Sequence, residues 1–107
     1  MGYIYLFECV SDWEITYKIG YTRNKDFKIR IRNLQTGNKD KIKCVDYFTS
    51  LFGRKIETVL HSLYSHKKIK NEWFALDLDD VVIFKMTCQK IENNFKILEK
   101  CDNPFFT

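Results

Sequence analysis

The chain has 107 residues, a length that suits one domain and leaves no room for a catalytic domain plus a separate recognition domain. Its composition, 45% hydrophobic and 30% charged with a single proline, is that of a folded globular protein and excludes a disordered or low-complexity chain. The formal net charge of +4 permits nucleic-acid binding but excludes a histone-like excess of basic residues.

The cysteines and the lack of a targeting signal indicate an intracellular protein. Cys9, Cys44, Cys88 and Cys101 form no CxxC pair and have no histidine at zinc-finger spacing, so a structural zinc site is not expected. There is no signal peptide, and no apolar run approaches the length of a membrane span. We therefore predict a soluble, intracellular protein with reduced thiols and no membrane partner.

The first two predicted elements form a β-hairpin. Residues 3–9 are a continuous aromatic and aliphatic run, which predicts a central strand covered on both faces. Residues 17–22 alternate large apolar side chains with polar or small ones, as a second strand would. The polar residues 11–14 between the two runs suit a hairpin connection.

A helix and a third strand are predicted next. Asp26 can cap a helix, and Gly37 stands where a left-handed residue would end it. Apolar residues recur between them at helical spacing, namely Phe27, Ile31 and Leu34. Residues 42–49 are rich in β-favouring side chains and predict the third strand, although their alternation is imperfect.

Two more helices complete the expected order. Residues 52–66 predict an amphipathic second helix, and a basic connection leads to a short apolar segment at residues 73–76 that suits a brief extra strand. A last helix at about residues 79–100 carries an apolar stripe that would pack on the sheet. The order predicts an α+β fold, with a small central antiparallel sheet of about three strands flanked by helices in one domain over residues 1–107.

Five segments together carry a resemblance to a known family. They are Gly2-Tyr3-Ile4-Tyr5, Lys18-Ile19-Gly20-Tyr21-Thr22, Arg30-Ile31-Arg32-Asn33-Leu34-Gln35-Thr36-Gly37-Asn38, Glu57-Thr58-Val59-Leu60-His61 and Asn71-Glu72-Trp73-Phe74. In this order they resemble the GIY-YIG nuclease superfamily, and within it the small branch, frequent in phages and large DNA viruses, that contains the T5orf172 and MUG113 domains. The resemblance extends over residues 2–76 and leaves the last helix outside.

The resemblance implies a metal-dependent endonuclease that hydrolyses phosphodiester bonds, in DNA more than in RNA. This chemistry needs an activated water, a cation that offsets phosphate charge, and support for the leaving oxygen. Matched by position, Tyr5 is the first motif's tyrosine, Arg30 is the helix arginine and Glu57 is the metal ligand. One carboxylate with phosphate oxygens and water suits Mg²⁺ or Mn²⁺. A viral source would place the protein in the cytoplasm or nucleus of the host.

Lys18 stands where the family has its second tyrosine, which leaves the identity of the proton acceptor open. In a regular strand Tyr17 and Tyr21 project to the opposite face, so either would reach the site only through a bulge or from the strand end. Lys18 would bind phosphate or, if desolvated, act as a base. His61, four residues after Glu57 on one helix flank, is a further supporting candidate for catalysis.

The predicted partner is nucleic acid, and two alternatives to an enzyme stay open. The residues predicted to contact nucleic acid are Lys18, Arg23, Arg30, Arg32, Lys68 and Lys70. Without a recognition domain, the protein would cut with little sequence preference or depend on a homodimer or an accessory partner. The alternatives are a module that binds nucleic acid without cutting it and a protein-interaction module. Taken singly, each residue also has a structural interpretation, as a strand aromatic, a solvated basic side chain or half of a surface ion pair.

Overall fold

A computed structural model describes residues 1–36 and 40–101. The strands are β1 (Gly2–Val10), β2 (Ile15–Thr22), β3 (Lys41–Ser50), β4 (Lys68–Lys70) and β5 (Trp73–Phe74). The helices are α1 (Lys28–Gln35), α2 (Gly53–Leu63), α3 (Leu78–Val82) and α4 (Phe84–Lys100), with a single 3₁₀ turn, η1 (Ser65–Lys67), after α2. The predicted α+β class is confirmed.

The strands form one antiparallel sheet in the order β3-β1-β2-β5-β4. As predicted, β1 lies in the interior of the sheet, paired along one edge with β2 and along the other with β3. The expectation of about three strands was wrong, because the basic segment after α2 forms β4 and a tight turn returns the chain as β5. Asn71 makes this turn with φ 54°, a left-handed conformation that asparagine tolerates better than most residues.

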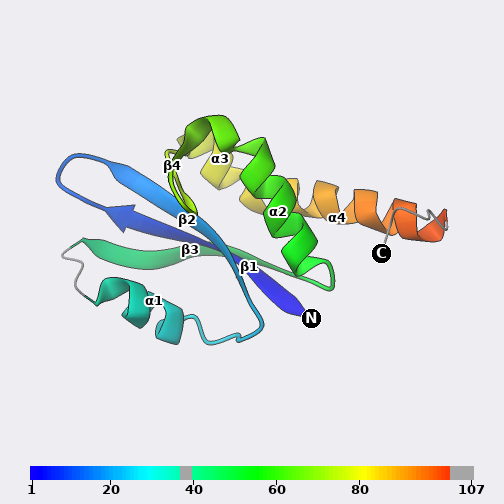
Figure 1. The fold of residues 1–107 in the computed structure, drawn as a ribbon, viewed down its shortest axis with the longest axis horizontal. Coiled ribbons are helices and arrows are strands. Elements are labelled where there is room, and N and C mark those ends of the chain that lie inside the picture. The colour runs from blue at the N-terminus through cyan, green and yellow to red at the C-terminus, as the bar shows by residue number, and fades with distance from the viewer. Residues whose placement is uncertain (37–39, 102–107) are drawn as a thin grey trace.

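Helices cover both faces of the sheet, which explains why β1 is apolar throughout. Figure 1 shows α1 on one face and α2, α3 and α4 on the other. Ile4 and Leu6 of β1 belong to the core under α2 and α4, whereas Tyr5 and Phe7 belong to the core under α1. All four side chains are almost fully buried. The two-residue period of a strand thus supplies two separate cores from one continuous run.

The helix ends differ in detail from those predicted. Asp26 Oδ1 accepts a hydrogen bond from the Lys28 backbone N–H at 3.0 Å, and α1 begins at Lys28. Its expected end at Gly37 lies outside the described residues. The stretch predicted as one last helix forms α3 and α4, separated at Ile83. A capping box between Asp77 and Asp80 starts α3.

Candidate functional site

The candidate site lies where strand pairing along one edge of β2 ends. β5 pairs only with Tyr17 and Lys18 of β2. The Ile19 backbone N–H donates to the Glu72 carbonyl oxygen at 3.2 Å, and the Ile19 carbonyl oxygen lies 2.8 Å from Nε2 of His61 on α2. At this point α2, which covers one face of the sheet, therefore reaches the backbone of β2.

Three side chains gather here into a group that could hold a metal ion. Glu57, His61 and Glu72 are each half-buried, and their potential ligand atoms all lie within 4.8 Å of one another. Glu57 and His61 come from one flank of α2, as their spacing predicted. Glu72 comes from the turn between β4 and β5, and the sequence did not single it out. Its position within Asn71-Glu72-Trp73-Phe74 was the one signal that could have identified it.

The ring of His61 is held in one orientation. A carbonyl oxygen can only accept a hydrogen bond, so Nε2 must donate to Ile19, and in the neutral imidazole Nδ1 keeps the lone pair. The ring also packs edge-on against Phe74, with centroids 5.1 Å apart. Histidines that bind metals typically anchor their second nitrogen on a carbonyl in this way, so His61 fits a ligand role.

The electrostatics of the group favour a bound cation. Burial raises the pKa of Glu57 above its ordinary value, and the negative charge of Glu72 raises it further. His61 in its protonated form, Arg54 and Lys18 act in the opposite direction. Two carboxylates held close together and partly away from water are stabilised by a divalent cation. The donor set of two carboxylates and one imidazole therefore fits such an ion.

The ammonium group of Lys18 lies beside this group. Its Nζ lies 2.5 Å from Oε2 of Glu72 and 5.8 Å from the ring centroid of Trp73, and its side chain is only 12% exposed. β2 keeps a regular register against β1, without a bulge. Tyr17 and Tyr21 therefore stay on the face opposite Lys18, as regular alternation predicted.

Tyr5 lies on the same face as Lys18, with its ring against Gly20 of the neighbouring strand. The two residues are paired in register, and a Cβ at position 20 would overlap the Tyr5 hydroxyl group. Burial raises the pKa of Tyr5 to about 12; the charge of Arg30 lowers it, and the charges of Glu72 and Glu57 raise it. Arg30 itself is exposed on α1. The Tyr5 hydroxyl is thus within electrostatic reach of α1, α2 and the turn before β5.

Other predicted site residues lie elsewhere. Tyr17 is buried in the core, and its hydroxyl donates to Glu8 Oε2 at 3.3 Å. Tyr21 lies on the α2 face, with the Arg54 guanidinium 4.8 Å from its ring centroid. Arg23 lies beyond the end of β2. The remaining predicted nucleic-acid contacts are exposed, with Arg32 in the last turn of α1 and Lys68 and Lys70 on β4, at the edge of the sheet.

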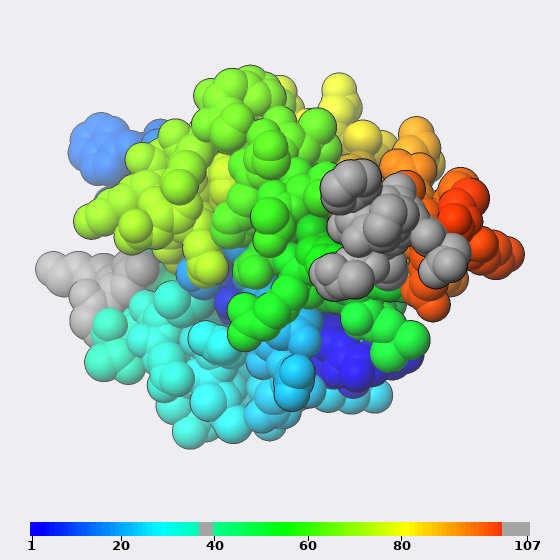
Figure 2. Space-filling view, turned by 45° about the vertical axis from the view of Figure 1, so that its right-hand side comes forward, coloured from blue at the N-terminus to red at the C-terminus, as the bar shows by residue number. Residues whose placement is uncertain are grey.

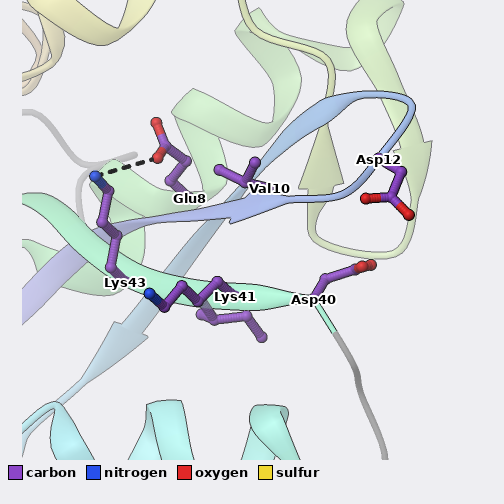
Figure 3. A pocket seen from close by; sticks show the side chains of 7 residues that line it. Glu8, Val10, Asp12, Asp40, Lys41 and Lys43 are labelled. Carbon is purple, nitrogen blue, oxygen red and sulfur yellow. Dashed lines mark ion pairs between the residues drawn. The ribbon is translucent and has the colours of Figure 1, made fainter.

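A separate hollow of about 790 Å³ lies on the opposite side of β1, towards β3. Figure 3 shows Glu8 and Val10 on β1 facing Lys41 and Lys43 on β3, with Glu8 and Lys43 joined by an ion pair of 3.5 Å. None of the predicted site residues lines it. The candidate chemistry is therefore at the β2 edge and not in this hollow.

The fold and the site define an α+β protein with a candidate metal centre at the edge of an antiparallel sheet. A comparison with protein families matches residues 2–88 to the T5orf172 domain. The chain belongs to the T5orf172 domain family, whose match reaches past residue 76 into α4, further than the motifs indicated. This membership points to a role related to nucleic acid.

Two other comparisons add no relatives. Neither the curated proteins nor the solved structures give a significant match to this chain. Within residues 1–36 and 40–101, no helix is both long enough and apolar enough to cross a membrane.

Proposed function

We propose that this protein is a GIY-YIG-type endonuclease that uses a divalent metal to hydrolyse phosphodiester bonds in nucleic acid, most readily in DNA. The observation that carries the proposal is the group of Glu57, His61 and Glu72 within 4.8 Å, next to Lys18 and within electrostatic reach of Tyr5. These residues come from distant parts of the chain. Their meeting at one sheet edge is difficult to explain by packing alone, because carboxylates repel one another.

The proposed metal is Mg²⁺ or Mn²⁺, held by Glu57 with His61 and Glu72. Carboxylate oxygens suit both ions, and the imidazole nitrogen favours Mn²⁺. When bound, such an ion supplies charge neutralisation at the phosphate and lowers the pKa of a bound water.

The side chains of the protein would orient the phosphate and its attacking water. With a pKa of about 12, Tyr5 is a neutral phenol near pH 7, so it would donate a hydrogen bond and position water or phosphate. Arg30 would bind the phosphate oxygens with its guanidinium group. Lys18 would contact the same phosphate from the β2 edge, and Nδ1 of His61 would bind metal or accept a proton.

A second candidate function is nucleic-acid binding without cleavage. The ion pair of Lys18 with Glu72 favours it, because the ammonium already neutralises one of the three ligand groups. In that case the protein would bind nucleic acid in a salt-dependent way, and metal would not convert binding into cleavage.

Cleavage assays separate these functions. Supercoiled plasmid and labelled single-stranded DNA and RNA would be incubated with the protein in Mg²⁺, Mn²⁺ or EDTA. We expect metal-dependent nicking that Glu57→Ala and Arg30→Ala each reduce by about 100-fold or more. Glu99→Ala and Lys90→Ala on α4 are the controls for a lost negative and a lost positive charge, because they remove these charges from exposed positions away from the metal group.

The possible outcomes have distinct meanings. Salt-sensitive binding without cleavage would replace the endonuclease by the binding module. Cleavage that survives Glu57→Ala would show that the metal group is wrongly assigned. No nucleic-acid binding at low salt would leave a protein-interaction module.

A further inference from the structure

A basic hollow lies at the start of α2, next to the metal group. Its volume is about 370 Å³, and its lining is Tyr21, Arg23, Leu51, Phe52, Arg54 and Lys55. Among residues 1–36 and 40–101, this lining therefore contains three cationic side chains and no acidic one. Figure 2 shows the green surface of α2 directly beside the light-blue surface of the segment that follows β2.

Tyr21 forms a fixed platform in this hollow. A Cβ at Gly2 or at Gly53 would overlap its ring, so the ring fits only because both positions are glycine. The Arg54 guanidinium lies over this ring at 4.8 Å from the centroid, in a cation–π arrangement. Glycines at these two positions therefore let the ring hold Arg54 in place before any ligand arrives.

The two guanidinium groups of the hollow are not paired with carboxylates in the described part of the chain. Neither Arg23 nor Arg54 forms an ion pair with any other residue that the structure describes. Phe52 provides no side-chain cap for α2 and the first turn of this helix has no acidic residue, so the positive end of the helix dipole adds to the potential here. Two unpaired guanidinium groups beside an uncapped helix end form an environment suited to an anion.

The hollow is in line with the metal group along α2. Arg54 precedes Glu57 by three residues and His61 by seven, so all three lie on one side of the helix. One such step of three residues rises about 4.5 Å along the axis. An extended polyanion bound at the metal group would therefore continue over Arg54.

We propose that the hollow of Tyr21, Arg23, Arg54 and Lys55 binds a backbone phosphate of the nucleic-acid strand, next to the phosphate held at the metal group. The strand then runs along α2 from His61 towards its first turn. This inference rests on the proposed function, since it supplies the second contact point for the same substrate. It assigns to Arg54 and Lys55 a role that no sequence motif indicated.

The test is binding of a short, fluorescently labelled single-stranded DNA to the full chain in EDTA, followed by anisotropy over a range of NaCl concentrations. We expect Arg23→Gln and Arg54→Gln each to weaken binding about tenfold at low salt. Each should also reduce the slope of log affinity against log salt by about 0.7, the value for one lost phosphate contact on a single strand. Lys90→Gln, which removes an exposed charge from α4, should leave the slope unchanged.

Two further measurements distinguish the loss of a phosphate contact from a loss of folding stability. Arg54→Lys retains the charge without the planar group, so it should keep the salt slope while losing part of the affinity. Urea unfolding reports whether a variant is destabilised. If Arg54→Gln unfolds easily, the binding result for Arg23→Gln decides whether the hollow binds phosphate, because Arg23 is exposed and lies outside the cation–π pair.

The outcomes distinguish this proposal from the proposed function. Wild-type binding and cleavage that neither Arg23→Gln nor Arg54→Gln weakens would overturn the hollow as a phosphate site and leave the endonuclease intact. A wild-type protein that neither binds nor cuts nucleic acid would overturn both.

Discussion

Two tyrosines of the same hairpin, Tyr5 and Tyr21, lie on opposite faces of the sheet and each packs against glycine. The Tyr5 ring lies over Gly20, whereas the Tyr21 ring lies between Gly2 and Gly53. Tyr5 is 1% exposed, with its hydroxyl near Arg30 and two glutamates. Tyr21 is half-buried and faces Arg54. Tyr5 therefore offers a hydroxyl to the metal side of the site, and Tyr21 offers a ring that positions a cation.

The largest expected difference between the two tyrosines is in the cleavage rate. Tyr5→Phe keeps the buried ring and removes the hydroxyl, so we expect the rate of plasmid nicking to fall about 100-fold. Tyr21→Phe keeps the platform for Arg54 and should change the rate little. The proposed difference between the roles of Tyr5 and Tyr21 is wrong if both variants lose the same activity, or if Tyr5→Phe cuts as fast as the wild type.

A second, smaller difference is expected when the glycines are replaced. Gly20→Ala places a methyl group against the Tyr5 hydroxyl, and we expect it to lower the free energy of unfolding by about 1–3 kcal/mol. Gly53→Ala also crowds a ring, but alanine regains up to about 1 kcal/mol of helix propensity at the start of α2, so its net cost should be smaller.

Urea unfolding with a double-mutant cycle measures these costs. The penalty of Gly20→Ala should shrink when Tyr5 is also replaced by leucine, because the clash is then removed. An unchanged penalty in that background would mean that Gly20 is needed for its backbone and not for the space it leaves to Tyr5.

The smallest expected difference concerns stability at high pH. The pKa of Tyr5 in the folded protein is about 12, above its ordinary value of 10.0, so the unfolded chain loses this proton first. The protonated Tyr5 hydroxyl group therefore makes its full contribution to stability below pH 10, and this contribution is lost as the pH rises from 10 towards 12. Near pH 11 the wild type should have lost roughly 1 kcal/mol more stability than Tyr5→Phe.

Urea unfolding of both proteins at pH 8 and near pH 11 measures this loss. The other tyrosines are common to the two chains, so their titration cancels in the difference. Equal losses in the two proteins would show that the Tyr5 hydroxyl is better hydrated than its burial indicates.

Several parts of the site could be predicted from local patterns. The spacing of Glu57 and His61 placed both on one flank of α2, and the alternation along β2 separated Lys18 from Tyr17 and Tyr21. The continuous apolar run of β1 predicted a strand covered on both faces. In each case the periodicity of a single helix or strand determines which side chains share a face.

Other parts depended on contacts that no local pattern encodes. Glu72 joins Glu57 and His61 because β5 pairs with β2. The sequence pattern predicts only a connection where the short strand β4 forms. The basic hollow at the start of α2 likewise depends on Gly53 of α2 lying against Tyr21 of β2.

By itself, the sequence determined the α+β class, most of the element order and the candidate residues that lie in recognisable motifs. The tertiary structure alone decided that the sheet has five strands, that Lys18 pairs with Glu72, and that Tyr21 holds Arg54. The physical reason is that hydrophobic periodicity reports which face of an element is buried, whereas the pairing register of distant segments decides which side chains meet.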